Sequence, residues 1–260
     1  MNNQPTVFHI THHKAGSQWV AEVLKYCALE RIVPPKIGVA HFRNEAIKPG
    51  GIYPTVYVSK QEFEAVMASA TYCNWRTHIL RYLQTFLSRQ NDYIKFIVIR
   101  DLRDTLVSLY ISLKISHPLL TDQYYKWRKT LNRLDKEGGF IYLMDGILLD
   151  IANIQLSWLN DEALLITYEN LLADEYTVFE RIMNYCQIDV ARQRLHEIIR
   201  YNSFEAVTGR KPGEEDVTAH QRKGISGDWR NHFSERVKEE FKKRFGDVLI
   251  KTGYEYDRNW

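Results

Sequence analysis

The sequence predicts an α/β fold, a single domain with a mainly parallel central sheet. Short β-branched, apolar segments alternate along the chain with longer segments whose apolar residues recur every three or four positions. The 260 residues are 45% apolar and 26% charged, which is the composition of a globular chain with ample core material. That length allows one large domain or two small ones. Because no internal repeat or interdomain linker interrupts the chain, we expect one domain over residues 1–260.

Charge and cysteine content exclude several classes of protein. The 35 basic and 32 acidic side chains leave a formal charge of +3, too small to indicate a nucleic-acid partner. Cys27, Cys73 and Cys186 stand far apart and predict buried thiols in a reducing compartment, not a disulfide framework or a zinc site. The first residues lack a signal-peptide pattern, and no run approaches the roughly 18–20 apolar residues that cross a bilayer. We expect a cytoplasmic protein without a membrane span.

The first strand–loop–helix unit opens the chain. Residues 6–11 are short, β-branched and apolar, as in a buried strand, and the turn 12–17 follows at once. Apolar side chains spaced by three and four then indicate a helix from Trp19 to Cys27. A strand, a glycine-containing loop and a helix in that order are the opening of a βαβ unit.

The next segments lead to a second strand and helix. After a loop that extends to Gly50-Gly51, residues 53–58 resemble a strand. Ser59 and Glu62 then form a capping box for the following helix. Residues 70–80 are expected to mix strand and loop.

A second strand–turn–helix unit begins at residue 93. Residues 93–100 read as a strand, 101–104 as a turn and 105–113 as the opening of a helix. Asp104 is a natural N-cap for that helix, because a short carboxylate can accept from its first N–H groups.

The rest of the chain is mostly helical. Its best amphipathic stretch is 140–158, and residues 163–172 supply another strand with the loop after it. Helices continue to residue 201. The polar segment 208–222 contains Pro212-Gly213 and is expected to be a mobile loop. The last helix starts near residue 234 and runs to about residue 251.

The turn at 12–17 has the features of an anion-binding site. It brings together backbone N–H groups, the start of a helix and Lys14, and both unpaired amides and the helix dipole favour negative charge. The turn does not match G-x-x-x-x-G-K-[ST], because it has one glycine and its lysine precedes that glycine. A nucleotide triphosphatase is therefore disfavoured. Taken alone, the segment is equally well explained as a plain βα turn with a solvated lysine.

Two further segments contain basic and hydroxyl side chains that could also bind an anion. Arg100 ends a strand and Ser108 lies one turn into the next helix, so both belong at the carboxyl edge of the sheet, where open α/β folds bind ligands. The alternative is a surface ion-pair cluster of Arg100 with its charged neighbours. In 221–229, Arg222 and Lys223 precede glycines that let backbone amides approach an anion, although such a motif alone would usually be a basic turn.

In this order and spacing, the segments resemble the motifs of the PAPS-dependent sulfotransferase family, whose donor is 3′-phosphoadenosine 5′-phosphosulfate (PAPS). H-H-K-A-G-S-Q-W at 12–19 resembles the family's Y-P-K-S-G-T-T-W, and R-K-G-I-S-G-D-W at 222–229 resembles its R-K-G-x-x-G-D-W almost letter for letter. Arg100 and Ser108 resemble the pair of family residues that contacts the 3′-phosphate, and residues 76–80 resemble the K-T-H-L-P motif. Tyr168-Glu169 resembles the family's Y-E-D motif, and Ser203-Phe204 resembles its S-F motif. They run from residue 6 to residue 232 and imply a P-loop-like three-layer fold, with helices flanking the parallel sheet.

The resemblance also implies the reaction. A sulfuryl group would move in line from PAPS to a hydroxyl, or less often an amine, of a small-molecule acceptor, and adenosine 3′,5′-bisphosphate (PAP) would be the product. Lys14 would stabilise charge on the leaving phosphate oxygen and His78 would remove the acceptor proton, with Ser108 as the third catalytic residue. No metal is implied. The residues implied to bind the cofactor are Lys14, Ala15, Gly16, Ser17, Gln18, Trp19, Arg100, Ser108, Tyr168, Ser203, Phe204, Arg222, Lys223 and Gly224.

The chain departs from the family pattern at several motif positions. His13 replaces the proline of the loop, Ala15 its serine, and Ser17-Gln18 its paired threonines, while Leu80 stands where the family has proline. The helix after R-K-G-I-S-G-D-W lacks the K-x-x-x-T-V-x-x-x-E segment that many animal cytosolic members use for dimerisation. A dimer is therefore not implied, and the oligomeric state is left open.

The acceptor pocket is the part of the site that the sequence defines least. Aromatic residues between the cofactor motifs suggest an apolar or aromatic hydroxyl acceptor, and ordinary packing explains them equally well. These residues are Phe42, Tyr53, Tyr57, Phe86, Tyr124 and Trp127.

Two other functions stay open. A P-loop-like kinase or nucleotidase is disfavoured by the missing Walker lysine and by the absence of paired acidic magnesium ligands. A non-catalytic nucleotide-binding module is disfavoured by the retention of both Lys14 and His78.

Overall fold

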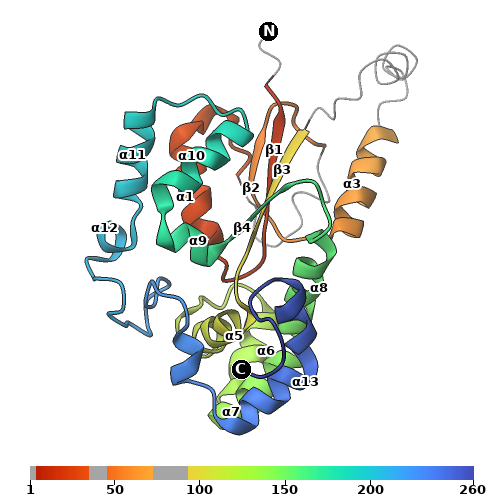
Figure 1. The fold of residues 1–260 in the computed structure, drawn as a ribbon, viewed down its shortest axis with the longest axis vertical. Helices are drawn as coiled ribbons and strands as arrows, with labels where there is room; N and C mark the ends of the chain where they lie inside the picture. The colour runs from red at the N-terminus through yellow and green to blue at the C-terminus, as the bar shows by residue number, and fades with distance from the viewer. Residues whose placement is uncertain (1–3, 35–45, 73–92) are drawn as a thin grey trace.

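Within the described residues, four parallel strands form the central sheet (Figure 1). The computed structural model describes residues 4–34, 46–72 and 93–260. From β1 the chain passes to a neighbour on one side and then crosses to the other side, so the switch point of the topology lies between β1 and β3. Across the sheet the strands are β2 (Ile52–Val56), β1 (Thr6–Ile10), β3 (Tyr93–Ile99) and β4 (Leu164–Thr167).

Both faces of the sheet are buried, which explains why its strands are apolar at successive positions. On one face, Val7 and Phe96 belong to a core shared with helices that follow the first and the last strand of the sheet in sequence. On the other face, Phe8 and Ile97 pack in a second core that includes Trp158. Successive side chains of one strand therefore pack into different cores, on opposite faces of the sheet.

Helices cover both faces and fill the space below the carboxyl edge of the strands (Figure 1). One face carries α1 (Ser17–Cys27), α9 (Tyr168–Ala173), α10 (Glu175–Tyr185) and α11 (Arg192–Tyr201), with the short α12 (Phe204–Thr208) beside them. The other face carries α3 (Lys60–Tyr72) and part of α8 (Ile147–Trp158). Below the carboxyl edge, a third core joins α8 to α5 (Leu102–Ile111), α7 (Lys136–Met144) and α13 (Glu235–Lys251), with α6 (Asp122–Leu131) against it. In the part of the chain that the structure describes, the single turns are η1 (Leu29–Arg31), the π-helical η3 (Ser112–Ser116) and η4 (Asp228–Asn231). The predicted α/β fold with a parallel sheet between helical layers is confirmed.

Several local predictions are confirmed at their capping residues. The Ser59 N–H donates to Glu62 Oε2 (2.9 Å) and the Glu62 N–H donates to Ser59 Oγ (3.3 Å), which is the reciprocal pattern of a capping box. Ser234 is the N-cap of α13, where its Oγ accepts from the Val237 N–H.

Three local predictions need correction. Helix α5 begins at Leu102 and its N-cap is Asp101, which accepts from the Arg103 N–H (2.8 Å), so Asp104 already lies in the first turn. The stretch 140–158 is two helices, interrupted at Asp145-Gly146. Helix α3 continues through residue 72, so 70–72 are helical and the rest of 70–80 lies outside the described residues.

Membrane-span and cysteine predictions can be compared with the described ranges. There, no single helix is long and apolar enough to cross a bilayer, although α7 and α8, bent by 45°, pass the length and composition test as a pair. Cys186 is buried as expected, Cys27 is only half-buried, and Cys73 falls in a range the structure does not describe.

Candidate active site

A cavity of about 1320 Å³ opens at the carboxyl edge of the sheet, beside the switch point between β1 and β3. The loop after β1, the turn after β3 and the segment before η4 all line it, although they are far apart in sequence. Ala15 is fully buried in the loop and does not reach the wall. The other residues predicted to bind a cofactor all line the cavity: Lys14, Gly16, Ser17, Gln18, Trp19, Arg100, Ser108, Tyr168, Ser203, Phe204, Arg222, Lys223 and Gly224.

The loop between β1 and α1 has an unusual backbone. Lys14 and Gly16 both have left-handed conformations, with φ of 69° and 75°; glycine adopts these freely, whereas lysine rarely does. Gly16 is the N-cap of α1, and no side chain of the described residues caps this helix or places an acid in its first turn. The first N–H groups of α1 therefore have no partner within the helix. A helix N-terminus of this kind beside a cavity favours a bound anion.

Buried His12 ties this loop to the turn after β3. Its Nε2 accepts hydrogen bonds from the Arg100 N–H (3.2 Å) and from Gln155 Nε2 (2.8 Å). Its Nδ1 donates to the His13 carbonyl (2.9 Å), so these partners fix the neutral tautomer with its proton on Nδ1. Burial lowers the pKa of His12 to about 3. Neutral His12 thus holds the two cavity-facing segments in a fixed relation.

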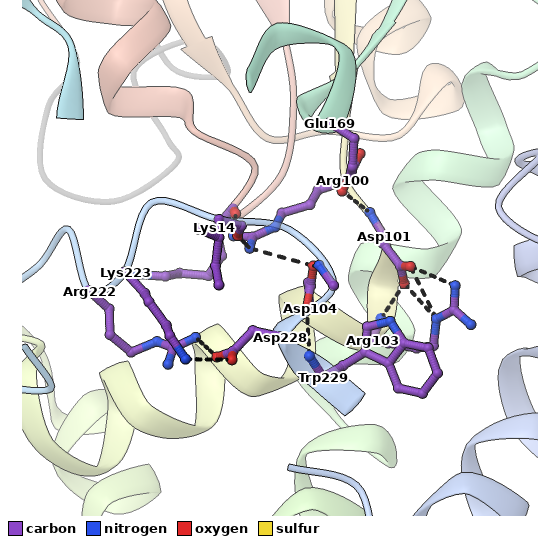
Figure 2. Close-up of polar contacts among 12 residues, drawn as sticks. Lys14, Arg100, Asp101, Arg103, Asp104, Glu169, Arg222, Lys223, Asp228 and Trp229 are labelled. Carbon is purple, nitrogen blue, oxygen red and sulfur yellow. Dashed lines mark hydrogen bonds and ion pairs between the residues drawn. The ribbon is translucent and has the colours of Figure 1, made fainter. Parts of the chain in front are cut away.

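Arg100 crosses between three segments of the cavity wall (Figure 2). Its Nη1 donates to the Lys14 carbonyl (2.9 Å), its Nη2 donates to the Ile225 carbonyl (3.4 Å), and its guanidinium lies 4.4 Å from the centre of the Tyr168 ring. Its Nε is buried and finds no hydrogen-bond partner among the described residues. An unmet buried donor is costly, and an anion in the cavity would satisfy it.

The Lys14 ammonium is the most strongly perturbed cation of the site. Burial, and secondly the charges of Arg100 and Arg222, lower the pKa of Lys14 to about 8. Its Nζ donates to Ser112 Oγ (3.3 Å), a contact between residues far apart in sequence. Ser112 was not predicted from the sequence, although its position four residues after Ser108 puts both hydroxyls on one helix face. Ser108 lines the cavity as predicted.

The basic pair of the third segment is held by a buried carboxylate. Asp228 accepts from Arg222 Nη2 (2.6 Å) and Lys223 Nζ (2.7 Å) (Figure 2). Arg222 also pairs with Glu215. Although burial raises the pKa of Asp228, hydrogen bonds from its cationic and amide neighbours hold it well below its usual range. Glu215, Asp228 and His232 place ligand atoms within 4.8 Å of one another, but in the described structure the two cations already neutralise this acidic cluster.

Asp104 fixes the turn that carries these cations. Its carboxylate accepts from the Gly227 N–H (2.5 Å) and the Trp229 N–H (2.9 Å) (Figure 2). The carboxylate that the sequence suggested as a helix cap therefore anchors a segment from the other end of the chain. Local sequence gives no signal for such a contact, because both partners are distant in sequence.

Three aromatic side chains among the residues implied to bind the cofactor, Trp19, Tyr168 and Phe204, line the cavity. A Cβ at Gly16 would lie 2.9 Å from the Tyr168 ring, and a Cβ at Gly224 would lie 2.6 Å from the Phe204 ring. Glycine at these two positions lets the rings lie directly against the backbone. Trp19 Nε1 is buried without a partner among the described residues. Glycines, rings and free donors together form a cradle that suits an adenine nucleotide.

Two of the residues predicted for the acceptor pocket line the cavity, Tyr57 and Tyr124. The Tyr57 hydroxyl lies 2.7 Å from Ser17 Oγ, and the Tyr124 ring stacks on His117 with centroids 4.2 Å apart. Burial raises the pKa of Tyr57 to about 12. An uncharged aromatic wall therefore faces the cationic loop.

The structure does not bring Tyr53 and Trp127 to the cavity. Tyr53 is 3% exposed and stacks in the core on the second face of the sheet, and Trp127 packs against the core of the helices below it. Apolar packing explains both residues, because cores and pockets draw on the same side-chain types. Phe42, Phe86 and His78 lie outside the described residues, so their roles stay predictions.

The segment 208–222 borders the cavity and makes internal hydrogen bonds. The Gly213 N–H donates to the Lys223 carbonyl (2.8 Å), and Arg210 Nη1 donates to the carbonyls of Glu214 (2.9 Å) and Arg222 (2.7 Å). Pro212, His220 and Gln221 line the cavity. Movement of this segment over the site stays a prediction.

A family model and several known proteins match most of the chain. The model of the sulfotransferase domain matches residues 4–253. Sulfotransferase 2A1 of Homo sapiens is 25% identical over 94% of this chain and 84% of its own. The 3-beta-hydroxysteroid sulfotransferase of Cavia porcellus is 29% identical over 60% of this chain and 55% of its own. A solved mouse sulfotransferase complexed with PAP has a TM-score of 0.65 at 18% identity, over 96% of this chain and 84% of that one. A retinol dehydratase in complex with androsterone and PAP has a TM-score of 0.58 at 13% identity, over 94% of this chain and 80% of that one. This chain belongs to the sulfotransferase domain family.

Proposed function

We propose that the chain transfers a sulfuryl group from PAPS to a hydroxyl of a small-molecule acceptor. The observation that carries the proposal is the meeting of Lys14, Arg100 and the 222–223 cation pair with the free N-terminus of α1 at one cavity. Cations and unpaired amides in one site favour a ligand with several anionic groups. PAPS has such groups at both ends of its adenosine, and two structural relatives of this chain were solved with PAP.

The cavity residues would divide the donor between them. Backbone amides at the start of α1, with the Ser17 and Gln18 side chains, would hold the 5′-phosphosulfate. Arg100, Ser108 and the 222–224 turn would hold the 3′-phosphate, and the orphaned Arg100 Nε is a donor ready for it. Trp19, Tyr168 and Phe204 would enclose the adenine, since aromatic faces stack on a base. All the residues named here for holding the donor line the cavity. Ala15, which the sequence also implied as a cofactor-binding residue, does not.

Charge stabilisation would supply much of the catalysis. When the bond between sulfur and the bridging phosphate oxygen breaks, that oxygen gains negative charge, and a positioned cation lowers the barrier. Lys14 is suited to this work because its ammonium is buried beside the helix N-terminus. The family resemblance assigns proton removal from the acceptor to His78, which lies outside the described residues.

The acceptor would enter on the aromatic side of the cavity. Tyr57, Tyr124 and Leu120 line that side, and they suit an acceptor with an apolar body and one reacting hydroxyl. Two relatives are named as hydroxysteroid sulfotransferases, which agrees with an alcohol on an apolar frame. The 208–222 segment beside the cavity would act as its lid.

Ligand binding tests the proposal before any acceptor is known. PAP is expected to raise the thermal unfolding midpoint by several degrees at saturating concentration, and ATP with Mg²⁺ is expected to raise it less. Stronger stabilisation by ATP with Mg²⁺ would favour a kinase or nucleotidase instead. Turnover is then measured with sulfur-labelled PAPS against a panel of alcohols and phenols. Tight PAP binding without turnover on any acceptor would favour a non-catalytic nucleotide-binding module.

A further inference from the structure

Residues 252–260, which follow α13, fold back along that helix, and we call them the return segment (Figure 1). The Tyr254 N–H donates to the Leu249 carbonyl (2.8 Å), so the chain turns where α13 ends. Trp260 then packs on Phe241 in the first half of α13, with ring centroids 6.1 Å apart. The return segment therefore leads back toward η4, which lies just before α13 in the chain.

Two polar side chains connect the return segment to the junction of β3 and α5. The Glu255 carboxylate pairs with Arg103 Nη1 (2.5 Å), and Arg103 is only 2% exposed. The Tyr254 hydroxyl donates to Glu169 (2.7 Å), whose other oxygen accepts from the Asp101 N–H (3.2 Å). Asp101 in turn pairs with Arg103 Nη2 (2.7 Å) (Figure 2). These contacts fix the return segment to the turn after β3, which lines the cavity.

Trp260 completes an aromatic stack around the Arg103 guanidinium. The guanidinium carbon lies 4.2 Å from the centre of the Trp229 ring and 4.5 Å from the centre of the Trp260 ring. The two indole rings meet edge to face, with centroids 5.4 Å apart and planes at 85°. We call these three side chains the Arg103 stack. Attraction between a cation and aromatic rings is strongest where water is excluded, as it is around Arg103.

Trp229 joins the Arg103 stack to the basic pair of the cavity (Figure 2). Its N–H donates to Asp104 Oδ1 (2.9 Å), so both the backbone and the ring of Trp229 are held. The residue before it, Asp228, pairs with Arg222 (2.6 Å) and Lys223 (2.7 Å). The carboxylate that orients the two cations is therefore next in sequence to the ring on which the return segment packs.

We propose that Trp260 is a positioning residue for the 3′-phosphate subsite, an inference that rests on the proposed function. With Trp260 in place, the Trp229 ring is packed on two sides, and the 222–229 turn presents its cations at a fixed spacing. Without Trp260, one face of the Arg103 guanidinium opens to water and η4 loses a packing partner. The cations then have to be ordered by the ligand, which lowers its affinity. The loop after β1, which would hold the 5′ end of the donor, makes no contact with the Arg103 stack.

Two ligands separate the two ends of the donor site. Adenosine 5′-phosphate lacks the 3′-phosphate of PAP, so the ratio of the two Kd values measures recognition of the 3′-phosphate. Calorimetry gives the Kd of PAP, and displacement of PAP gives that of adenosine 5′-phosphate. Trp260→Ala removes one ring of the Arg103 stack, whereas Trp260→Phe keeps an aromatic ring there.

Two control variants accompany these measurements. Tyr256→Ala is the matched control, because Tyr256 belongs to the return segment and its side chain is fully exposed. Phe63→Leu is the control for stability, because Phe63 is buried in the core on the second face of the sheet. Thermal unfolding is followed for every variant, so that a loss of affinity can be compared with a loss of stability.

The proposal expects Trp260→Ala to raise the PAP Kd about tenfold or more and the adenosine 5′-phosphate Kd less than about twofold. The KM for PAPS should rise with the PAP Kd, while kcat at saturating PAPS stays within about threefold. Trp260→Phe should restore most of the PAP affinity. Glu255→Gln, which weakens the hold on Arg103 without removing a ring, should shift the ratio in the same direction by about two- to threefold. The test therefore holds even if Trp260→Ala does not fold.

Three results would overturn the role of Trp260. They are equal weakening of both ligands in Trp260→Ala, an unchanged ratio in both Trp260→Ala and Glu255→Gln, and a shift of the ratio as large in Phe63→Leu. Each would leave Trp260 with no more than a share in general stability. A wild type that binds PAP no more tightly than adenosine 5′-phosphate would instead remove the proposed function itself, and this inference with it.

Discussion

The affinity of the site for PAP should fall as the pH rises above 8, because of the charge state of Lys14. In the ligand-free protein the pKa of Lys14 is lowered from 10.5 to about 8, by burial first and by neighbouring cations second. A bound polyanion favours the ammonium and returns its pKa toward 10.5. Near pH 7 the ammonium is already formed, so binding takes up no proton. Above pH 8, binding must take up a proton and the affinity falls by up to tenfold per pH unit.

The size of this effect follows from the two pKa values. If ligand binding restores the pKa of Lys14 to 10.5, the affinity at pH 10 is roughly 70-fold weaker than at pH 7, or about 2.5 kcal/mol. Two other kinds of group near the ligand contribute little in this window. Phosphate groups have lost their second proton above pH 7, and the Tyr57 hydroxyl, with a pKa of about 12, stays protonated.

Isothermal titration calorimetry of PAP from pH 7 to 10 measures the dependence. Titrations in two buffers with different ionisation enthalpies should show proton uptake near zero at pH 7 and close to one at pH 9.5. Lys14→Arg is the matched control, because a guanidinium stays charged over the range and should remove the pH dependence. A wild-type Kd that is constant from pH 7 to 9.5, with no proton uptake, would refute the reasoning.

Three other predictions concern the cations and their partners. Arg100→Ala should weaken PAP binding by about 2–4 kcal/mol in calorimetry, because its guanidinium is largely buried and bridges three segments of the site; a Kd within twofold of wild type would contradict this. Glu215→Gln should tighten PAP binding by two- to fivefold, because it releases Arg222 from a partly exposed ion pair worth up to about 1 kcal/mol. Glu214→Gln is the neighbouring control, and weaker PAP binding in Glu215→Gln would contradict the role of Glu215 as a competitor for Arg222. Tyr254→Phe should lower the free energy of unfolding in urea by about 1–3 kcal/mol, because it removes the hydroxyl that donates to the half-buried Glu169 carboxylate (2.7 Å). Unchanged stability would mean that water replaces the bond.

Much of the anion-binding half of the site could be predicted because its determinants are local. The strand before Lys14 and the glycine and helix after it are all contained in one short stretch of sequence. Parallel strands then bring the Arg100 turn to the same edge of the sheet, since the carboxyl ends of such strands lie together.

The rest of the site depends on contacts between distant residues. Ser112 reaches Lys14, and Asp104 reaches the turn before η4, across long stretches of chain that carry no periodic or motif signal for them. Tyr53 and Tyr57 are on the same short stretch, yet one packs in the core and the other lines the cavity. Composition does not separate such neighbours; the pleat of the strand and the bend after it do.

Lys14 also combines two sources of instability in one residue. Its backbone is in the left-handed region, which for a side chain other than glycine costs on the order of 1–3 kcal/mol, and its buried ammonium loses solvation as well. A glycine at this position would relieve both penalties at once. Directed evolution that selects for heat resistance alone is therefore expected to favour variants without Lys14, and these variants would be more stable but inactive. Such a campaign is better run with PAP present throughout, so that retention of the bisphosphate and resistance to heat are selected together.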